Sequence, residues 1–417
     1  MLLSDLNTGQ KGVIVRVNGS GAFRKRILEM GFIKGKTIKV ILNAPLKDPI
    51  KYKIMDYEVS LRRSEAALIE VIYPEPHKVR DENLSHSLTD GSLDYYSTTE
   101  DVVASLRKPN SDSKKVIRVA LVGNPNAGKT SLFNIASGAH EHVGNYGGVT
   151  VDSKEGKFKH GGYTFKVVDL PGTYSLSAYT PEELFVRRHI VEDKPDVVIN
   201  IVAASNLERN LYLTTELIDM EVSTVIALNM YDELLETGSE FDYQSLSQMI
   251  GIPIVPTVAK TGVGIGDLFD AVIRVYEEKE PIVRRVHIYY GNVVENAISK
   301  LNILLEKEKE TPLIFPRRYI STKLLEKDKD VDAYVGSLSN AADIYALRDS
   351  EVKYIEDTLK EDTESVLTNA RYGFVAGGLK QTLKEKLFES DITRMIDAVV
   401  TNKYIGFPVF FFFMWVM

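Results

Sequence analysis

Residues 123–130 form a glycine-rich segment of the kind that binds phosphate groups. Their sequence, GNPNAGKT, fits the pattern of two glycines separated by four residues and followed by Lys and Thr. Glycines let backbone N–H groups approach phosphate oxygens, and the first turn of a following helix adds partial positive charge. We expect Lys129 to contact the β- and γ-phosphates of a nucleotide and Thr130 to supply a hydroxyl to Mg²⁺. The expected nucleotide contacts in this segment are Gly123, Asn124, Pro125, Asn126, Ala127, Gly128, Lys129, Thr130 and Ser131.

Two further segments are placed to act on the γ-phosphate. The segment Asp169-Leu-Pro-Gly172 begins 40 residues after Lys129. We expect Asp169 to hold Mg²⁺ through water and the Gly172 N–H to contact the γ-phosphate. Residues 144–150, GNYGGVT, lie between the two motifs, and Thr150 is expected to complete the Mg²⁺ shell when GTP is bound. The alternative for Thr150 is a plain strand residue.

Base recognition is expected from two segments nearer the C-terminus. In Asn229-Met230-Tyr-Asp232, the Asp232 carboxylate can accept hydrogen bonds from N1 and N2 of guanine, a donor pair that adenine lacks. The N–H of Ala259, in the segment TVAK at 257–260, is expected to meet the guanine O6. The same spacing recurs in Asn340-Ala-Ala-Asp343, but no strand precedes it. The expected base contacts are Asn229, Met230, Asp232, Val258, Ala259 and Lys260.

Each of these motifs follows an apolar run that is typical of a buried strand. A helical pattern over 130–137 follows the phosphate-binding loop, and apolar runs alternate with helical patterns throughout 116–280. This alternation predicts an α/β domain with a mostly parallel sheet. Parallel strands end at the same edge of a sheet, so the motifs should meet there. The expected strands are 117–122, 164–168, 197–202, 224–228 and 252–255.

The rest of the chain divides into four further segments. Residues 1–75 show short alternating runs broken by Gly and Pro, with one or two helical turns at 24–30, which predicts a small β-barrel. Residues 76–115 are polar and are expected to be a linker. Residues 281–402 show only helical periodicity. Residues 403–417 include the uncharged run IGFPVFFFFMWVM, which we interpret as the start of a transmembrane helix, since a complete span needs about 20 residues. A buried terminal strand or helix is the alternative.

Composition narrows the class of protein. The chain has no cysteine, which excludes disulfide scaffolds and thiolate metal sites and is compatible with a reducing cytoplasm. No signal peptide is visible. Residues 1–72 hold 13 Lys and Arg against 7 Asp and Glu, a balance of +6, which leaves −13 for the remainder of a chain whose total is −7. Such a basic module can meet a polyanion, a membrane surface or an acidic partner, or can simply be a solvated face.

Taken together, these motifs resemble the FeoB ferrous-iron transporters. The resemblance is carried by GNPNAGKTSLFN, VGNYGGVTVD, VVDLPGTYSLSAYTPEE and NMYD, and in the helical region by ARYGFVAGG and ITRMIDAVVTNKYIGFP. The first 72 residues are similar to FeoA, an SH3-like barrel, through RKRILEMGF, APLKDPIKY and EVSLRRSEA. The resemblance implies a fused FeoA–FeoB chain with a GTPase domain and a helical domain that stabilises bound GDP and couples to the membrane.

The resemblance also implies cofactors, partners and a location. GTP or GDP, Mg²⁺ and K⁺ are the expected cofactors, with Asn126 holding K⁺ against the phosphates; a simple turn residue is the alternative for Asn126. Asn126, Lys129, Thr150 and Gly172 are then the catalytic candidates. Fe²⁺ is the expected transported ion, the chain's own transmembrane domain beyond Met417 is the expected membrane partner, and a homo-oligomer is left open. The implied location is the cytoplasmic face of the bacterial inner membrane.

Three positions depart from related GTPases. Thr173 stands where Ras-like enzymes place the glutamine that orients water, which predicts either slow hydrolysis or a water molecule positioned by the switch backbone. Val258 replaces a common Ser of the guanine loop, and Gly147 replaces a common Pro of the switch loop. His140 and His142 alternate and share one strand face if that segment is extended, which leaves a metal site as a minor alternative.

One other functional class was weighed against the transporter module. A soluble GTPase of ribosome assembly, with an RNA-binding barrel, would also join a basic module to a GTPase. The acidic remainder, the NMYD motif and the apolar C-terminal run disfavour it, so no nucleic-acid partner is expected. The barrel is expected to regulate the GTPase or, alternatively, to serve only in assembly.

Overall fold

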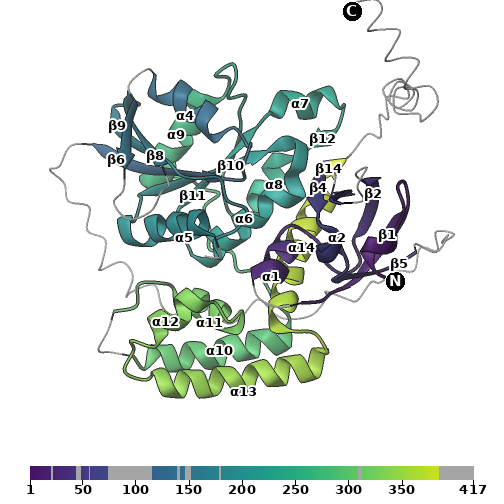
Figure 1. Cartoon of the computed structure of the whole chain (residues 1–417). Helices are drawn as coiled ribbons and strands as arrows, with labels where there is room; N and C mark the ends of the chain where they lie inside the picture. Colours follow the sequence, from purple (N-terminus) through teal and green to yellow (C-terminus); the bar gives the residue numbers. More distant parts are fainter. Residues whose placement is uncertain are drawn as a thin grey trace, which may run out of the picture.

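The first 73 residues fold into a small barrel-like sheet (Figure 1). The computed structural model describes residues 1–19, 22–43, 48–55, 57–73, 115–138, 141–145, 152–177, 180–308 and 312–384. The sheet order is β4-β3-β2-β1-β5, with every neighbouring pair antiparallel. Alternate residues of β3 face inward, as the predicted period of two requires. The elements are η1 (Leu3–Asp5), β1 (Lys11–Val17), α1 (Ala22–Glu29), β2 (Thr37–Asn43), β3 (Ile50–Ile54), β4 (Tyr57–Leu61), α2 (Arg63–Ala66) and β5 (Ile69–Ile72).

A seven-stranded sheet forms the centre of the next domain, in the order β13-β11-β10-β6-β9-β8-β7. The five predicted strands are the five that pair in parallel, so the predicted α/β domain with a mostly parallel sheet is confirmed. The strands β8 and β7 pair antiparallel at one edge. The strands are β6 (Val116–Gly123), β7 (Glu141–Asn145), β8 (Asp152–His160), β9 (Tyr163–Asp169), β10 (Val197–Ala203), β11 (Thr224–Asn229) and β13 (Ile254–Pro256).

Two details of the sheet differ from the sequence prediction. The last strand begins at Ile254 and not at Ile252, because the Ile252 N–H donates to the Ser247 carbonyl at the end of the preceding helix. The antiparallel strands β8 and β7 were not predicted. Polar residues such as Lys157 and Lys159, both exposed, occupy β8 because an antiparallel strand can face water on one side.

Helices cover both faces of this sheet (Figure 1). One apolar core joins the sheet to α4 and α9, and a second core lies on the opposite face, against α6 and α8. The helices are α4 (Lys129–Ser137), α5 (Pro181–Arg188), the π-helix η2 (His189–Asp193), η3 (Ala204–Asn206), α6 (Leu207–Asp219), α7 (Tyr231–Glu236), α8 (Tyr243–Ile250) and α9 (Ile265–Tyr276), with the short strand β12 (Glu240–Phe241) after α7.

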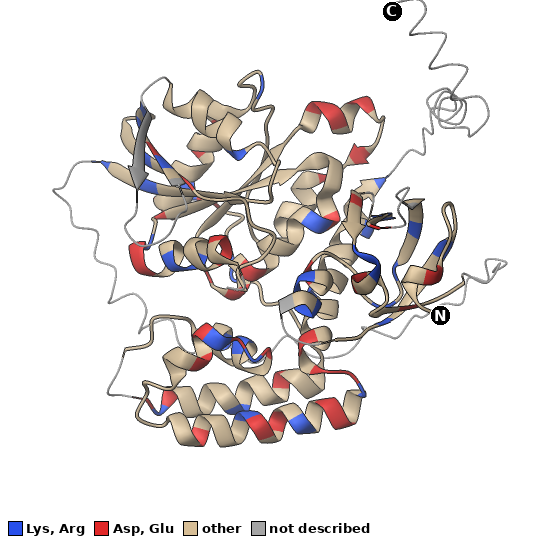
Figure 2. Ribbon diagram, viewed as in Figure 1, with Lys and Arg blue, Asp and Glu red and all other residues tan. Residues whose placement is uncertain are grey.

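The third region is a helical bundle, as predicted, with one short exception. Its helices are α10 (Asn292–Glu306), α11 (Arg317–Leu325), α12 (Lys329–Val335), α13 (Ala341–Leu359) and α14 (Thr363–Thr382). The long helix α14 leaves the bundle and packs on α6 and α8, and the two-residue strand β14 (Leu383–Lys384) then pairs with β12. Figure 2 shows charged residues on the two sides of the junction between bundle and sheet, of both signs along α5 and basic along α11.

Several of the predicted segments lie outside the described residues. They are the linker up to residue 114, His140, Gly147, Thr150 and residues 385–417, which include the end of the predicted helical region and the apolar run 405–417. Within the described part of the chain, no helix is both long and apolar enough to span a membrane.

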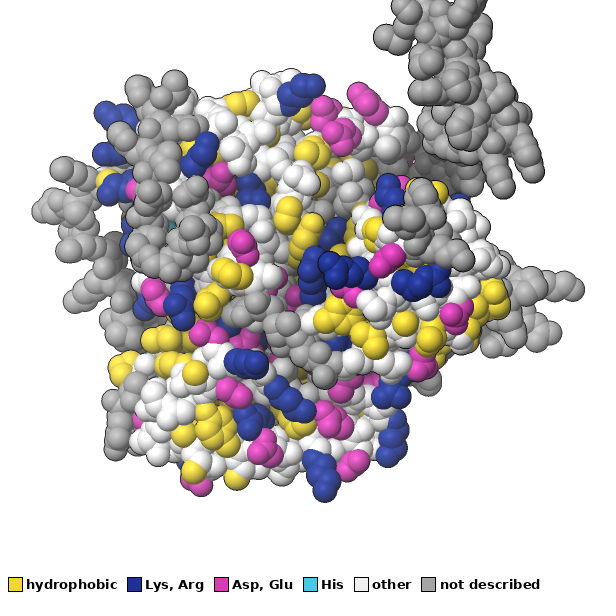
Figure 3. All heavy atoms as spheres, viewed as in Figure 1, with side chains coloured by type: hydrophobic (Ala, Val, Ile, Leu, Met, Phe, Trp, Pro, Cys, Tyr) yellow, Lys and Arg dark blue, Asp and Glu magenta, His cyan; other side chains and the backbone are white. Residues whose placement is uncertain are grey.

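The basic barrel docks on acidic side chains of the same chain. Arg24 pairs with Asp362 at 2.5 Å, Lys34 with Glu361 at 2.6 Å and Lys36 with Glu208 at 2.5 Å. Part of the positive charge therefore meets an acidic partner within the chain. Lys and Arg side chains also lie on the face of the barrel that is turned to the viewer in Figure 3, next to hydrophobic ones.

Candidate functional site

The glycines of the phosphate-binding loop are required by close backbone approaches. Gly123 and Gly128 both have positive φ, at 153° and 92°. A Cβ on Gly123 would collide with the carbonyl oxygen of Ile201, and one on Gly128 would collide with the side-chain amide of Asn229. The loop connects β6 to α4, so its backbone N–H groups lie at a helix N-terminus, where anions bind.

Lys129 lies buried in the centre of this loop. Its Nζ donates to the carbonyl oxygens of Gly123, at 3.1 Å, and Asn124, at 3.2 Å. Burial lowers the pKa of Lys129, and the nearby Asp169 carboxylate opposes that shift. The ammonium group is therefore held beside the loop with backbone carbonyl partners, which a phosphate of opposite charge can outcompete.

Thr130 and Asp169 meet at the start of α4. The Thr130 Oγ1 donates to Asp169 Oδ2 at 3.0 Å. A hydroxyl and a carboxylate fit Mg²⁺, which takes oxygen ligands and commonly uses one or two protein groups together with phosphates and water. The described residues contain no group of three or more His, Asp or Glu side chains suited to a metal, so the remaining ligands here would come from phosphate oxygens and water.

Asn229 connects the phosphate loop to the predicted base-binding loop. Its Nδ2 donates to the Ala127 carbonyl at 2.8 Å, and its Oδ1 accepts from the Ala259 N–H at 2.9 Å. The Ala259 N–H, which we expected to meet guanine, thus donates to Asn229 in this structure. Asn229 is 2% exposed. By bonding to both loops, the Asn229 side chain fixes the distance between them.

Asp232 is exposed at the first turn of α7, where its carboxylate faces solvent. Met230 precedes it with a left-handed backbone, φ 57°. Val258 pairs with Val263 across a tight turn, and Lys260 lies exposed in the same turn. By contrast, Asn340 lies at the start of α13, where its Nδ2 donates to the Leu304 carbonyl, so the second motif of this spacing belongs to the helical bundle.

The remaining predicted residues lie around the loop. Asn126 is exposed and left-handed, with φ 66°, at the tip of the phosphate loop, and Ser131 is exposed in the first turn of α4. Asn124 is 3% exposed, and its amide has no hydrogen-bond partner among the described residues. Gly172 lies against the loop, because a Cβ there would be 2.9 Å from the Cα of Pro125.

The side chain of Thr173 points away from the phosphate loop, although its backbone contacts it. Its N–H donates to the Gly123 carbonyl at 3.2 Å, while its Oγ1 donates to the Ser175 carbonyl at 2.5 Å. The hydroxyl is therefore occupied within its own loop. This geometry agrees with the expectation that no side chain at this position orients a water molecule.

Sequence reasoning missed the polar groups that hold the loop after Asp169. The Leu176 N–H donates to Glu216 Oε2 at 2.5 Å, and the other oxygen of Glu216 accepts from Lys323 at 2.8 Å. Both side chains are 1% exposed. The sequence signal is weak: Glu216 and Lys323 lie on the buried sides of α6 and α11, at positions where helical periodicity predicts apolar residues.

Three regions of the chain match known families. Residues 117–272 match the family described as ferrous iron transport protein B, residues 1–73 match the FeoA domain, and residues 290–384 match the FeoB cytosolic helical domain. Two relatives are curated proteins. A Porphyromonas gingivalis Fe(2+) transport protein A/Fe(2+) transporter FeoB fusion protein is 48% identical over 100% of this chain, and the Salmonella typhimurium Fe(2+) transporter FeoB is 34% identical over 73% of it. The chain spans 51% and 38% of their respective lengths.

Solved structures give the same result. A GDP-bound point mutant of the S. thermophilus FeoB G-domain is 34% identical, with a TM-score of 0.59, and the match covers 64% of this chain and 100% of that one. The cytosolic domain of the T. maritima FeoB iron transporter in a GDP form is 31% identical, with a TM-score of 0.55, over 64% of this chain and 100% of that one.

Proposed function

The chain belongs to the ferrous iron transport protein B family and carries a FeoA domain at its N-terminal end, and from that premise we propose that it binds and hydrolyses GTP. The observation that supports this proposal best is the meeting of four loops at one edge of the sheet. The loops after β6, β9, β11 and β13 meet there, and Asn229 joins two of them directly. This edge, at the carboxyl ends of parallel strands, is where α/β proteins bind nucleotides.

The residues divide the work of hydrolysis among them. The Lys129 ammonium neutralises charge on the β- and γ-phosphates, and Gly172 supplies a backbone N–H toward the γ-phosphate. Thr130 and Asp169, whose Oγ1 and Oδ2 atoms lie 3.0 Å apart, would hold Mg²⁺, which would neutralise charge at the phosphates when bound. Thr150 is proposed to complete this set. Hydrolysis is slow because Thr173 is tied to its own loop.

Asn126 is proposed to recruit K⁺ to the phosphates. Its left-handed backbone at the tip of the loop and its exposed side chain leave the carboxamide oxygen available to a cation beside the nucleotide. A monovalent cation there offsets the negative charge that develops on the leaving phosphates.

We further propose that this GTPase serves Fe²⁺ transport within a longer membrane protein. The named relatives are Fe(2+) transporters, and each is considerably longer than this chain. The test is Fe²⁺ uptake by cells that express the longer protein with or without residues 1–75. Uptake unchanged by that deletion would leave the barrel no regulatory role.

The base-binding assignment can be tested by exchanging the base. Xanthine carries a carbonyl where guanine carries its 2-amino group, so Asp232→Asn should accept xanthine and reject guanine. We expect the Kd for GTP to rise by at least about 100-fold while XTP gains affinity. Competition binding with GTP, XTP and ATP measures both changes.

A matched control is available in the helical bundle. Asp343, which ends the other motif of the same spacing, is exposed on α13, and Asp343→Asn should leave all three affinities unchanged. An Asp232→Asn chain that still prefers GTP would contradict the assignment.

The K⁺ proposal has its own test. GTP turnover is compared in KCl and NaCl of equal ionic strength, for the wild type and for Asn126→Ala. We expect K⁺ to accelerate only the wild type. Equal rates in the two salts would exclude the role proposed for Asn126.

A further inference from the structure

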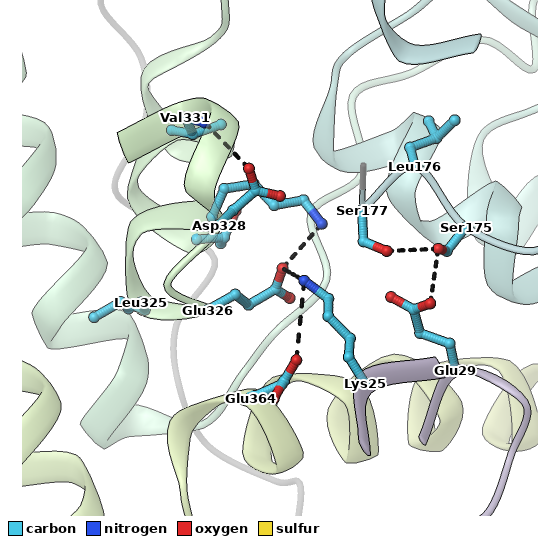
Figure 4. Close-up of polar contacts among 12 residues, drawn as sticks. Lys25, Glu29, Ser175, Leu176, Ser177, Leu325, Glu326, Asp328, Val331 and Glu364 are labelled. Carbon is cyan, nitrogen blue, oxygen red and sulfur yellow. Dashed lines mark hydrogen bonds and ion pairs between the residues drawn. The ribbon is translucent and has the colours of Figure 1, made fainter. Parts of the chain in front are cut away.

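The helix α1 of the barrel lies where all three regions of the molecule meet. Figure 4 shows two of its side chains pointing to different neighbours, Lys25 to the helical bundle and Glu29 to the loop that follows Asp169. The Lys25 Nζ lies 4.0 Å from carboxylate oxygens of both Glu326 and Glu364. The barrel is anchored on α14 beneath, where the Tyr372 hydroxyl donates to the Glu29 carbonyl at 2.5 Å.

Glu29 contacts the loop through a buried hydrogen bond. The Ser175 Oγ donates to Glu29 Oε2 at 2.8 Å and lies 2.8 Å from the Ser177 Oγ. Glu29 is 5% exposed and Ser175 is 0% exposed. A buried bond of this kind is costly to leave half made, so it fixes the position of the loop.

From Ser175, contacts continue to the phosphate loop. The Ser175 carbonyl accepts from Thr173 Oγ1, and the Thr173 N–H donates to the Gly123 carbonyl. Gly172, the proposed γ-phosphate contact, directly precedes Thr173 and lies against Pro125 of the phosphate loop. Three consecutive hydrogen bonds thus connect a side chain of the barrel to the backbone of the nucleotide site.

A second contact joins the barrel and the same loop. The Arg209 guanidinium, on α6, lies 3.8 Å from the ring centre of Tyr57 in the barrel and 4.0 Å from that of Tyr174 in the loop. The cation is sandwiched between two aromatic faces, an arrangement that is attractive on both sides. The loop is therefore held at two neighbouring residues.

We propose that Glu29 is a positioning residue for GTP hydrolysis, supplied by the barrel: it holds the loop of residues 170–177 so that Gly172 faces the γ-phosphate. The inference rests on the proposed GTPase function and assigns the barrel a defined role in it. A pre-positioned N–H donor raises the rate because no reorganisation is needed in the transition state. The barrel thereby acts on turnover without touching the nucleotide.

The surroundings of Glu29 favour its neutral form. Burial raises the pKa of Glu29 to about 8, Lys25 on its own helix opposes the shift, and the carboxylates of Glu216 on α6 and Glu183 on α5 add to it. The Ser177 hydroxyl favours the ionised form. A neutral Glu29 can be replaced by glutamine without loss of shape or of the acceptor for Ser175.

This property defines the experiment. Steady-state GTP hydrolysis by the whole chain is compared for the wild type, Glu29→Ala, Glu29→Gln and Ser175→Ala. We expect Glu29→Ala to lower kcat about 5- to 10-fold, with the KM for GTP and the Kd for GDP within about two-fold of wild type. Glu29→Gln should keep most of the activity, and Glu29→Ala combined with Ser175→Ala should be no slower than either alone.

Glu58→Gln is the matched control. Glu58 is a half-exposed carboxylate on β4 of the same barrel, paired with Lys51, and its loss should change nothing. The proposal is overturned if Glu29→Ala keeps a kcat within two-fold of wild type. It is equally overturned if kcat and thermal stability fall while the KM for GTP rises, and glutamine does not rescue these changes, since that pattern indicates a purely structural role.

Hydrogen exchange separates this inference from the proposed function. In the nucleotide-free chain, amides of residues 170–177 should exchange faster in Glu29→Ala than in the wild type, and unchanged exchange overturns the hold on the loop whether or not GTP is hydrolysed. If the wild type does not hydrolyse GTP but Glu29→Ala still exchanges faster over 170–177, the GTPase assignment and the effect on turnover are refuted. The contact between Glu29 and the loop then stands.

Discussion

The phosphate-binding edge of the sheet and the junction between sheet and helical bundle both bury charged side chains, but they satisfy them in opposite ways. At the junction, Arg371 pairs with Asp219 and Glu326, and Lys323 pairs with Glu216 and Glu326, all with side chains 1% exposed. At the phosphate-binding edge, the hydrogen bonds of the Lys129 ammonium go to backbone carbonyls.

The electrostatics follow this difference. Burial alone would lower the pKa of Lys323, but the carboxylates of Glu216 and Glu326 raise it well above the usual value. For Lys129, burial prevails and the pKa is lowered. At the junction, each buried cation is therefore paired with carboxylates of the same chain, and the pairs stabilise the fold. At the nucleotide site, the buried ammonium is available to pair with a negatively charged ligand.

Breaking the junction should have the largest effect. Arg371→Ala leaves Asp219 and Glu326 buried without their main cation, which we expect to lower the free energy of unfolding by about 3–5 kcal/mol. Chemical denaturation measures this loss. Lys327→Ala, which removes the exposed pair with Glu356, is the control and should cost less than about 1 kcal/mol. Similar losses of stability for Arg371→Ala and Lys327→Ala would contradict the structural role assigned to the buried pairs of the junction.

At the nucleotide site the expected effects are reversed. Lys129→Met should weaken GTP binding or turnover by about 100-fold, equivalent to about 2.7 kcal/mol. The free energy of unfolding should stay within about 1 kcal/mol, because the hydrogen bonds of this ammonium go to backbone carbonyls and its burial is itself costly. Nucleotide titration and denaturation of the same sample check the two statements. A large loss of stability would show that Lys129 is a structural residue.

The pH dependence of stability sharpens the comparison at Glu29, which lies between the two regions. Its folded pKa of about 8 is above the unfolded value of 4.5, so the folded state binds the extra proton and the stabilisation is complete below pH 4.5 and lost as pH rises through 8. Between pH 6 and 7.5 the wild type should lose on the order of 2 kcal/mol relative to Glu29→Gln. Parallel curves for the two proteins would show that Glu29 is ionised when folded.

The smallest effect is expected at the rim of the barrel interface. Lys34 pairs with Glu361, but its side chain is 61% exposed. Lys34→Ala should change the free energy of unfolding by less than about 0.5 kcal/mol, and less still at high salt. Arg24→Ala, which removes a pair whose arginine is 12% exposed, provides the comparison. Equal effects would mean that burial does not set the strength of the interface.

The amino-acid sequence by itself determined the elements of the fold and the identity of the phosphate-binding loop. Buried strands such as 117–122 and 197–202 are apolar except for Arg118 and Asn200, because both faces of a parallel sheet are covered. The phosphate-binding loop GNPNAGKT can be recognised from the sequence because the spacing of its glycines and the helix that follows are local properties. The antiparallel strand β8 was missed because its solvent-facing side carries polar residues, so that it shows no continuous apolar run.

Only the tertiary structure decided how these elements cooperate. Asn229 braces Ala127 across 102 positions of the chain, and Glu29 reaches Ser175 across 146. Such contacts depend on how packed elements are oriented, and no periodicity or short motif encodes them. A glutamate in the last turn of an amphipathic helix looks like a surface residue in the sequence. Burial against α6 and α14 makes it the link between barrel and nucleotide site.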